Sequence, residues 1–355
     1  MEVADLLSRL IQAESPSGGE LAAQRVLGAA LEELGFEVRV DPAGNLETVL
    51  GEGPEILLTG HMDIVPAGDP AAWPYPPFGG VIEGGRIWGR GAVDMKGPLA
   101  AMVGALSRLR GGRLAGSVRF LAVVQEEVGG LGSRYAASRL TSHVALLGEP
   151  SRLHLMRGHR GRTEVWADFE GEQAHAALAR GVNPLYAMAR FLEALSSLRL
   201  PQVQITPTRV ESDPPASNVV PAVARVVLDL RHEPGADLAQ ALDRLRALGG
   251  EASIYIPEEE MSSGSVRLRY PRHVPAYWLD DRELLGRALE LLGQTEAELW
   301  AFTTDAPYLA QAGIPVLGYG PGDPALAHTV FEHLELDELE RAVEGYVRLV
   351  KGLWA

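Results

Sequence analysis

The sequence predicts an α/β protein in which a mostly parallel sheet is sandwiched by helices and a smaller α+β domain is inserted. Short continuous apolar runs alternate with helical stripes up to about residue 150, as in a parallel sheet that is covered on both faces. Near Arg157 the pattern changes to alternating strands with two amphipathic helices, and near Pro271 the first pattern returns. We therefore predict a main domain of residues 1–157 and 271–355 and an inserted domain of residues 158–270.

The predicted elements of the main domain follow one another in a strand–helix order. A helix, a turn and a second helix come first, and Ser17 with Glu20 fits a capping box for the second helix. Helical spacing of apolar residues also predicts helices over 99–109, 284–292 and 336–349. Strands are expected over 36–40, 56–58, 118–124, 144–147, 299–302 and 315–317.

The inserted domain has a different pattern, with strands that alternate in hydrophobicity. Strands are expected over 162–169, 219–230 and 252–256, and helices over 183–198 and 236–248. Two helices among short strands indicate an α+β domain with one antiparallel sheet. Residues 257–275 are expected to form the connection back to the main domain.

Length and charge agree with two globular domains and exclude some function classes. Of the 355 residues, 46% are hydrophobic, and the 47 acidic residues against 32 Lys and Arg give a net charge of −15. This charge disfavours nucleic acid and anionic membranes as partners. No cysteine is present, which excludes disulfides, thiolate metal sites and a cysteine nucleophile. Neither a signal peptide nor a run of about 18 apolar residues is found, so we expect no membrane span and a cytoplasmic protein.

Acidic and imidazole side chains follow three of the predicted apolar strands. His61 and Asp63 follow the first, Glu126 and Glu127 the second, and Glu149 the third. Sites in open α/β sheets form beyond the carboxyl ends of the strands. We therefore expect these side chains to meet at one edge of the sheet.

Two further candidates come from loops. Asp94 lies in the glycine-rich stretch 89–97 before a helix, and His328 lies near the end of the chain. Each candidate alone has an ordinary explanation, since Asp94 could cap the helix and an acidic pair such as Glu126 and Glu127 is usually solvated. Together they would repel one another unless cations or raised pKa values neutralised them. Imidazole and carboxylate donors without thiolate suit zinc, cobalt or manganese better than magnesium or calcium.

The arrangement suits a pair of metal ions. Two ions about 3.5–4 Å apart need a bridging carboxylate and terminal ligands on each side. Water between them needs a nearby base, and Glu126 and Glu127 could divide the roles of ligand and base. The His-Glu-X-X-His helix, the Gly-X-Ser-X-Gly elbow and the Gly-Lys-Ser/Thr phosphate loop are all absent from the sequence. A two-metal phosphatase is disfavoured because no cationic phosphate clamp accompanies the acids.

These motifs resemble those of the dinuclear zinc amidohydrolase family that includes acetylornithine deacetylase, succinyl-diaminopimelate desuccinylase, aminoacylases and glutamate carboxypeptidase. The resemblance covers nearly the whole chain. The matching motifs are Thr59-Gly60-His61-Met62-Asp63-Ile64-Val65-Pro66, Gly89-Arg90-Gly91-Ala92-Val93-Asp94-Met95-Lys96-Gly97, Gln125-Glu126-Glu127, Gly148-Glu149-Pro150 and His328.

The resemblance implies a metal centre and names its ligands. His61, Asp94 and Glu149 would hold one ion, and Asp94, Glu127 and His328 the other, with Asp94 bridging. The cofactor would be two divalent metal ions, zinc by expectation, with cobalt or manganese as alternatives.

The resemblance also implies roles around the metals. Glu126 would be the general base and later the proton donor to the leaving amine, and Asp63 would orient the neighbouring histidine ligand. The inserted domain would be a lid and dimerisation domain, and the protein a homodimer. His175 would stabilise the oxyanion from the partner subunit, and Asn218 and Arg231 would contact substrate.

Each residue of the inserted domain also has a local explanation. His175 could make a hydrogen bond within its own segment, and Arg231 could form a surface ion pair with Glu233 or Asp229. These alternatives stay open beside the roles that the resemblance implies.

The expected substrate is an N-acyl amino acid or a short peptide. Stretches 148–151, 158–161, 179–183 and 304–307 look most like acetylornithine deacetylases of arginine biosynthesis. The alternatives are a hydrolase that releases lysine or ornithine from an amino-group carrier protein, a desuccinylase, a dipeptidase or carboxypeptidase, and an inactive binding homologue. The usual proline after the His175 motif and the Gly-Thr-Ser-Asp form of the 303–306 loop are absent. Both departures weaken the desuccinylase and lysine-hydrolase interpretations.

Overall fold

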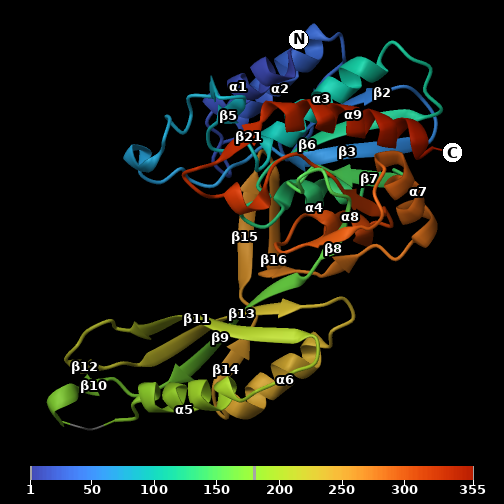
Figure 1. Cartoon of the computed structure of the whole chain (residues 1–355). Coiled ribbons are helices and arrows are strands. Elements are labelled where there is room, and N and C mark those ends of the chain that lie inside the picture. The colour runs from blue at the N-terminus through green and yellow to red at the C-terminus, as the bar shows by residue number, and fades with distance from the viewer. Residues whose placement is uncertain (1, 179–180, 355) are drawn as a thin grey trace. The chain divides into compact units, whose positions relative to one another are not determined.

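The computed structural model describes residues 2–178 and 181–354, and they form two compact units. The first unit comprises residues 1–158, 261–268 and 278–355, and the second comprises residues 159–260 and 269–277. Residues 261–268, within the predicted inserted domain, thus belong to the first unit, and residues 271–277 belong to the second. Figure 1 shows the elements of both units.

The helices and strands are labelled in chain order. The helices are α1 (Val3–Gln12), α2 (Leu21–Glu33), α3 (Lys96–Leu109), α4 (Leu131–Ala137), α5 (Pro184–Ser196), α6 (Leu238–Gly249), α7 (Arg282–Leu292), α8 (Ala306–Gln311) and α9 (Leu336–Gly352). The strands up to residue 170 are β1 (Arg39–Val40), β2 (Leu46–Leu50), β3 (Glu55–His61), β4 (Val81–Glu83), β5 (Arg86–Trp88), β6 (Ser117–Val123), β7 (Val144–Leu147), β8 (Met156–His159) and β9 (Gly161–Glu170). The later strands are β10 (Ala174–His175), β11 (Val203–Asp213), β12 (Val219–Val220), β13 (Val223–His232), β14 (Ser253–Tyr255), β15 (Glu258–Ser263), β16 (Val266–Pro271), β17 (His273–Val274), β18 (Tyr277–Trp278), β19 (Glu298–Trp300), β20 (Val316–Gly318) and β21 (His333–Glu335).

The first unit is built on a sheet whose centre is parallel. Its strand order is β1-β2-β6-β3-β7-β20-β8-β18, with β19 beside β8. The pairs β3–β6, β3–β7 and β7–β20 are parallel, and the flanking pairs β1–β2, β2–β6 and β8–β20 are antiparallel. The central strands β3, β6 and β7 are almost entirely buried, because helices cover both faces.

The helices of the first unit form a layer on each side of the sheet. Helix α3 packs on β3 and β6 between α1 and α9, whereas α8 contacts β20 and packs against α4. In Figure 1, α3 and α9 lie on one side of the sheet and α4 and α8 on the other. This is the predicted α/β sandwich.

The second unit is an antiparallel sheet with two helices. Its strand order is β11-β13-β9-β14, with β17 also beside β9. Strand β9 alternates between buried and exposed residues, and its buried side packs with α5 and α6. Phe169 of β9 and Phe191 of α5 meet in this core, with ring centroids 5.4 Å apart. The unit is therefore α+β.

Several predicted elements differ from the structure. The strand expected over 36–40 is reduced to β1 at Arg39–Val40, and the strand expected over 219–230 is divided into β12 and β13 around Pro221. The connection over 257–275 contains β15, β16 and β17, and the eleven-residue strand β11 was not predicted. The capping box is wrong, because the Ser17 hydroxyl donates to Asp63 Oδ2 at 2.7 Å and α2 has no side-chain cap.

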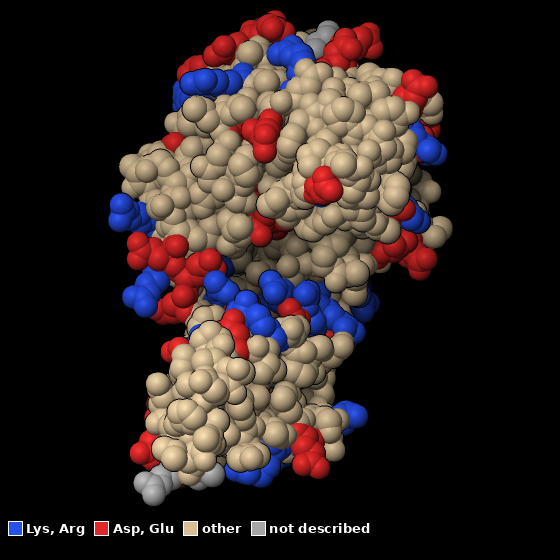
Figure 2. Space-filling model, turned by 90° about the vertical axis from the view of Figure 1, so that its left-hand side faces the viewer, with Lys and Arg blue, Asp and Glu red and all other residues tan. Residues whose placement is uncertain are grey.

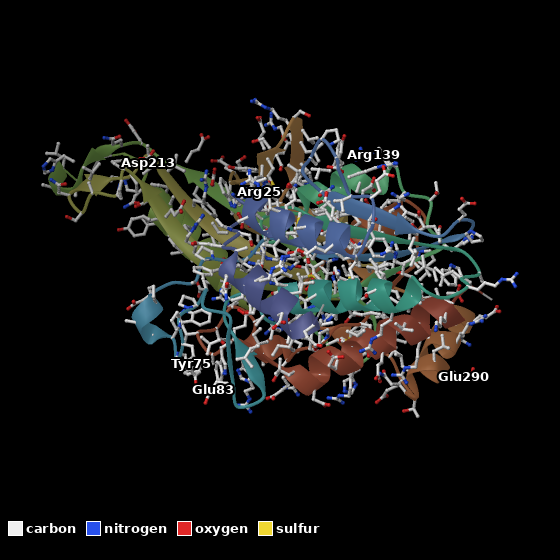
Figure 3. All side chains as sticks on the ribbon, turned by 90° about the horizontal axis from the view of Figure 1, so that it is seen from above. Arg25, Tyr75, Glu83, Arg139, Asp213 and Glu290 are labelled. Carbon is white, nitrogen blue, oxygen red and sulfur yellow. The ribbon has the colours of Figure 1, made fainter. Side chains whose placement is uncertain are left out.

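Acidic and basic side chains are distributed differently on the face of the molecule that Figure 2 shows. On the face in Figure 2, Asp and Glu side chains are spread widely, whereas Lys and Arg gather most densely in one area. Charged residues such as Arg25 of α2 and Glu290 of α7 are exposed and point outward from the ribbon (Figure 3). Within residues 2–178 and 181–354, no helix has both the length and the apolar character that crossing a membrane requires.

Candidate metal centre

The predicted ligands come from the same edge of the central parallel strands. His61 ends β3, Glu126 and Glu127 follow β6, and Glu149 follows β7. Because β6, β3 and β7 are parallel neighbours, their carboxyl ends lie side by side. Local strand pattern and sheet order together therefore produce a cluster from residues far apart in sequence.

Asp94 lies at the centre of this cluster. It is in the loop between β5 and α3, and its peptide bond to Met95 is cis. Its Oδ1 is 3.0 Å from His61 Nε2, and its Oδ2 is 3.1 Å from His328 Nε2. Each oxygen of this carboxylate thus faces a different histidine.

Each of these two histidines also faces a second carboxylate. His61 Nε2 lies 3.8 Å from Glu149 Oε1, and His328 Nε2 lies 3.1 Å from Glu127 Oε1. His61 is buried, whereas the side chain of His328 is 50% exposed. His328 has a positive φ of 63°, which is uncommon for a residue with a side chain.

The donor atoms are close enough to share metal ions. Among the described residues, one group of potential ligands is His61, Asp94 and Glu127, and another is His61, Glu126 and Glu149. The ligand atoms within each group lie within 4.8 Å of one another. Two imidazoles and several carboxylates without thiolate match the donors that zinc, cobalt and manganese accept. The residues therefore fit a centre for divalent ions.

Burial and crowding shift the protonation of the acids. Burial, with the nearby charge of Asp305, raises the pKa of Glu126 well above its usual value, and burial with Asp94 does the same for Glu149. Burial raises the pKa of Glu127 as well. Asp94 behaves differently: burial opposes its ionisation, but hydrogen bonds from His328 and His61 outweigh it and lower its pKa. Without other cations, protons would have to neutralise the cluster.

The histidines hold charge more readily than usual. Hydrogen bonds to Asp94 and Glu127 raise the pKa of His328 to about 10. For His61, burial acts to lower the pKa, but Asp63 and Asp94 outweigh it and raise the pKa well above the usual value. In their protonated forms the two imidazoles would neutralise part of the acidic charge.

Asp63 holds the strand ends together. Its Oδ1 and Oδ2 accept hydrogen bonds from the backbone N–H groups of Glu126 and Glu127, at 3.1 and 3.2 Å. Its backbone carbonyl lies 2.9 Å from His61 Nδ1, so that Nε2 is left to face Asp94. One fully buried aspartate therefore orients both the histidine and the acidic pair.

Three buried acids near the centre were not predicted as site residues. Glu20 Oε1 accepts from the N–H groups of Gly18 and Gln125, so it supports the loop that precedes Glu126. Asp305 is 2% exposed, and burial raises its pKa to about 6. The third is Glu332, which is fully buried and directly precedes β21. The sequence suggested only a capping motif for Glu20 and a family-like stretch for Asp305, and the contact of Glu20 with Gln125 joins residues that are 105 positions apart.

The remaining predicted residues lie in the second unit. His175 is exposed in β10, and its Nδ1 accepts from the N–H of Ala177 at 3.1 Å. Asn218 is exposed, and its carbonyl accepts from Ala176 at 3.0 Å, so β10 and β12 place it beside the His175 segment. Arg231 donates to Asp229 Oδ1 at 2.6 Å. This is one of the two ion pairs that the sequence suggested as a local explanation for Arg231. Residues 179–180 of the stretch 179–183 lie outside the described residues.

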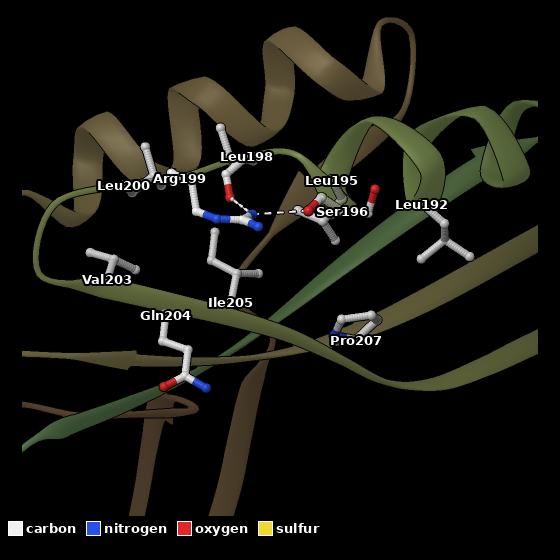
Figure 4. Close-up of a pocket in the computed structure, with 10 residues that line it drawn as sticks. All are labelled: Leu192, Leu195, Ser196, Leu198, Arg199, Leu200, Val203, Gln204, Ile205 and Pro207. Atoms are coloured by element: carbon white, nitrogen blue, oxygen red, sulfur yellow. Dashed lines mark hydrogen bonds between the residues drawn. The ribbon is translucent and has the colours of Figure 1, made fainter.

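A pocket of about 490 Å³ also lies in the second unit (Figure 4). It is lined by the end of α5, by residues 198–200 that follow this helix, and by residues of β11. Arg199 lies in its wall and donates to the carbonyls of Ser196 and Leu198. None of its ten lining residues is a predicted site residue.

Comparisons with known sequences identify the family of this chain. Residues 57–352 match the family described as Peptidase family M20/M25/M40. A succinyl-diaminopimelate desuccinylase of Rhizorhabdus wittichii is 30% identical over 99% of this chain and 98% of its own length. A protein of Pyrobaculum aerophilum, provisionally named LysW-lysine/LysW-ornithine hydrolase, is 31% identical over 99% of this chain and 98% of its own length.

Solved structures show the same fold. A tripeptidase of Staphylococcus aureus matches with a TM-score of 0.79 and 19% identity, covering 99% of this chain and 97% of that chain. A Bacillus subtilis protein, described as a dinuclear metal binding peptidase of the M20 family, matches with a TM-score of 0.74 and 17% identity, covering 98% and 96%. The chain belongs to peptidase family M20/M25/M40 and is a metal-dependent amidohydrolase or peptidase.

Proposed function

We propose that this protein hydrolyses the amide bond of N-acyl amino acids at a centre of two divalent metal ions. The observation that carries the proposal is the position of Asp94, whose two oxygens face His61 and His328 at 3.0 and 3.1 Å. A carboxylate that offers one oxygen to each of two sites is what a bridged pair of ions requires.

The ligands divide into two sets around this carboxylate. His61 and Glu149 would complete one site, and His328 and Glu127 the other, because each histidine faces its own second carboxylate. When bound, the ions would polarise the substrate carbonyl and supply hydroxide at neutral pH. Zinc fits this donor set, and cobalt or manganese would fit it too.

Glu126 would move the proton. Glu126 lies in one group of potential ligands with His61 and Glu149, and burial raises the pKa of its carboxyl, so that its carboxylate form is a stronger base than usual. Such a group can take a proton from water and return it to the leaving amine. Asp63 would keep it in place through the backbone of Glu126.

The second unit would supply substrate contacts. In this proposal His175 stabilises the oxyanion from the partner subunit of a homodimer, and Asn218 and Arg231 bind the substrate. Two observations are compatible with these roles: His175 is exposed on a short strand beside Asn218, and Arg231 is positioned by Asp229. Replacing the imidazole in His175→Ala would then lower kcat more than it raises KM.

The names of two relatives support a choice of substrate class. These names contain succinyl-diaminopimelate, LysW-lysine and LysW-ornithine, each of which includes a diamino acid. Acetylornithine, expected from the motifs, is also an acylated diamino acid. We propose that the leaving group is a diamino acid. A panel of N-acetylornithine, N-succinyl-diaminopimelate, lysine-charged LysW carrier protein and a dipeptide, each assayed with added Zn²⁺ or Co²⁺, identifies the acyl group. Cleavage of the dipeptide alone would favour a peptidase instead.

The general base has its own test. We expect Glu126→Gln to keep two metal ions per chain and to lower kcat by about 10²–10⁴-fold, because it removes the proton carrier but no ligand. Elemental analysis measures the metal, and steady-state kinetics on the best substrate of the panel measures the rate. Glu290→Gln, on the exposed surface of α7, is the control. A wild-type rate in Glu126→Gln would refute the assignment.

A further inference from the structure

Glu332 is a buried acid to which the proposed reaction gives no role. It directly precedes β21, which pairs with β5 in a small antiparallel sheet, with His333 opposite Trp88. The carbonyl of Glu332 continues this pairing by accepting the N–H of Gly89 at 3.1 Å. The strand pairing thus carries Glu332 to the loop that contains Asp94.

The side chain of Glu332 is hydrogen-bonded through both oxygens. Its Oε1 accepts from the backbone N–H groups of Val93 and Asp94, at 3.0 and 3.2 Å. Its Oε2 accepts a hydrogen bond from Arg90 Nη1. Arg90 is itself buried and lies over the Trp73 ring, 5.0 Å from its centroid. Glu332 therefore links Arg90, Val93 and Asp94 through one buried carboxylate and so holds the loop 90–94 in place.

Steric contacts and buried hydrogen bonds also restrict the backbone conformation of the loop 90–94. Gly91 has a φ of 85°, and a Cβ there would come within 3.0 Å of Ile64 and Lys96 side-chain atoms. Lys96 is fully buried and donates to the carbonyl of Ala13 at 2.8 Å. The segment on both sides of Asp94 is thus held by buried polar contacts, and those of Glu332 reach the Asp94 backbone itself.

A second buried acid, Asp63, holds the loop of Glu126 and Glu127 in the same way. Asp63 accepts the N–H groups of the consecutive residues Glu126 and Glu127, as Glu332 accepts those of Val93 and Asp94. Burying a carboxylate costs free energy unless it is paired and fully hydrogen-bonded. Both acids meet that condition. Each accepts hydrogen bonds from backbone N–H groups of proposed catalytic residues or of their immediate neighbours.

We propose that Glu332, paired with Arg90, is a positioning residue for Asp94. By fixing the Val93–Asp94 backbone it directs one oxygen of Asp94 toward His61 and the other toward His328. The inference rests on the proposed function, because it takes Asp94 to be the ligand that both ions share. Loosening this backbone should therefore weaken both metal sites together.

The test is Co²⁺ binding to the full-length protein. We expect Glu332→Gln to bind both Co²⁺ ions about 10–100-fold more weakly in a chelator competition, and to alter the d–d absorption bands of bound Co²⁺. The matched control is Glu335→Gln, which removes an exposed ion pair with Arg86 between the same two strands. This control should keep wild-type affinity and spectrum.

The outcomes separate the inference from the proposed function. A wild-type protein that binds no Co²⁺ overturns the proposed function and the inference with it. A wild-type protein that binds two ions, with Glu332→Gln equal to it in affinity and spectrum, overturns the inference alone, as does an equal loss in Glu335→Gln. If Glu332→Gln is unfolded by circular dichroism, the double variant Arg90→Met/Glu332→Gln takes its place, since it leaves no buried charge unpaired. Wild-type Co²⁺ affinity in that variant also overturns the inference.

Discussion

Several ionisable side chains of this protein are buried away from water, and their neighbours determine whether each of them is ionised. Burial and neighbouring acids raise the pKa values of Glu126 and Glu149, whereas for Asp94 burial is outweighed by two histidines and the pKa falls. Identical carboxylates thus differ in protonation because of their neighbours. A bound metal ion would favour the ionised form of these acids. It would thereby offset the free-energy cost of burying several carboxylates together.

Asp229, in the second unit, allows a residue-scale test by pH. Burial opposes its ionisation, but Arg162 and Arg231 outweigh this and hold its pKa below the ordinary value of 3.8. A depressed carboxyl pKa contributes stability above the unfolded-state value, and the contribution is lost as pH falls through the folded-state value. We expect Asp229→Asn to cost at most about 1 kcal/mol at pH 7, because both arginines are partly exposed.

The cost of Asp229→Asn should shrink below about pH 4 and vanish in strong acid. Urea denaturation of wild type and variant at several pH values measures it. A cost that grows as the pH falls would contradict the assignment of the shift to these ion pairs.

At the scale of elements, strand order assembles the centre and an amphipathic helix stabilises the second unit. Helix α5 begins at Pro184, where the Asn183 side chain accepts from Leu185 N–H, and its buried face carries Met188, Phe191 and Leu195. These side chains cover the β9–β13 sheet, which would otherwise expose its apolar face.

This helix provides an element-scale prediction. We expect Phe191→Ala to lower the free energy of unfolding of the second unit by about 3–5 kcal/mol, because Phe191 is 2% exposed in the core. Tyr186→Ala is the matched control on the same helix, since Tyr186 is 68% exposed, and it should change stability by less than about 0.5 kcal/mol. Urea denaturation followed by circular dichroism compares the two. Equal losses would mean that α5 does not pack as described.

At the scale of the whole molecule, two units with separate cores should respond separately to metal. All proposed ligands lie in the first unit. A ligand at about 100 times its Kd stabilises the state that binds it by ~2.7 kcal/mol per site. We expect EDTA to lower the Tm of the first unit and to leave the transition of the second unit in place. Differential scanning calorimetry measures both.

The control for the metal prediction is His328→Asn, which removes one proposed ligand. Its Tm should fall less than that of wild type on adding EDTA, because it has less metal affinity to lose. If EDTA shifted no transition of the wild-type protein, or shifted both equally, the placement of the metals in one unit would be wrong.

Sequence was sufficient where local pattern reflects burial. The runs at 56–58, 118–124 and 144–147 became β3, β6 and β7, because strands covered on both faces need continuous apolar residues. The same runs located His61, Glu126, Glu127 and Glu149, since each follows a strand end. The sequence also excluded cysteine chemistry and predicted the family through its motifs.

Only the tertiary structure revealed the elements and contacts whose partners are remote in the chain. Strand β11 is an edge strand with mostly exposed residues, so its sequence lacks a buried pattern. Ser17 and Glu20 match a capping-box motif in the sequence. In the structure, however, the Ser17 hydroxyl donates to Asp63 and the Glu20 carboxylate accepts from the N–H of Gln125. Glu332 reaches Asp94 across 238 positions. Hydrophobic periodicity is a local property of the chain, whereas a hydrogen bond depends on which segments the folded sheet brings together.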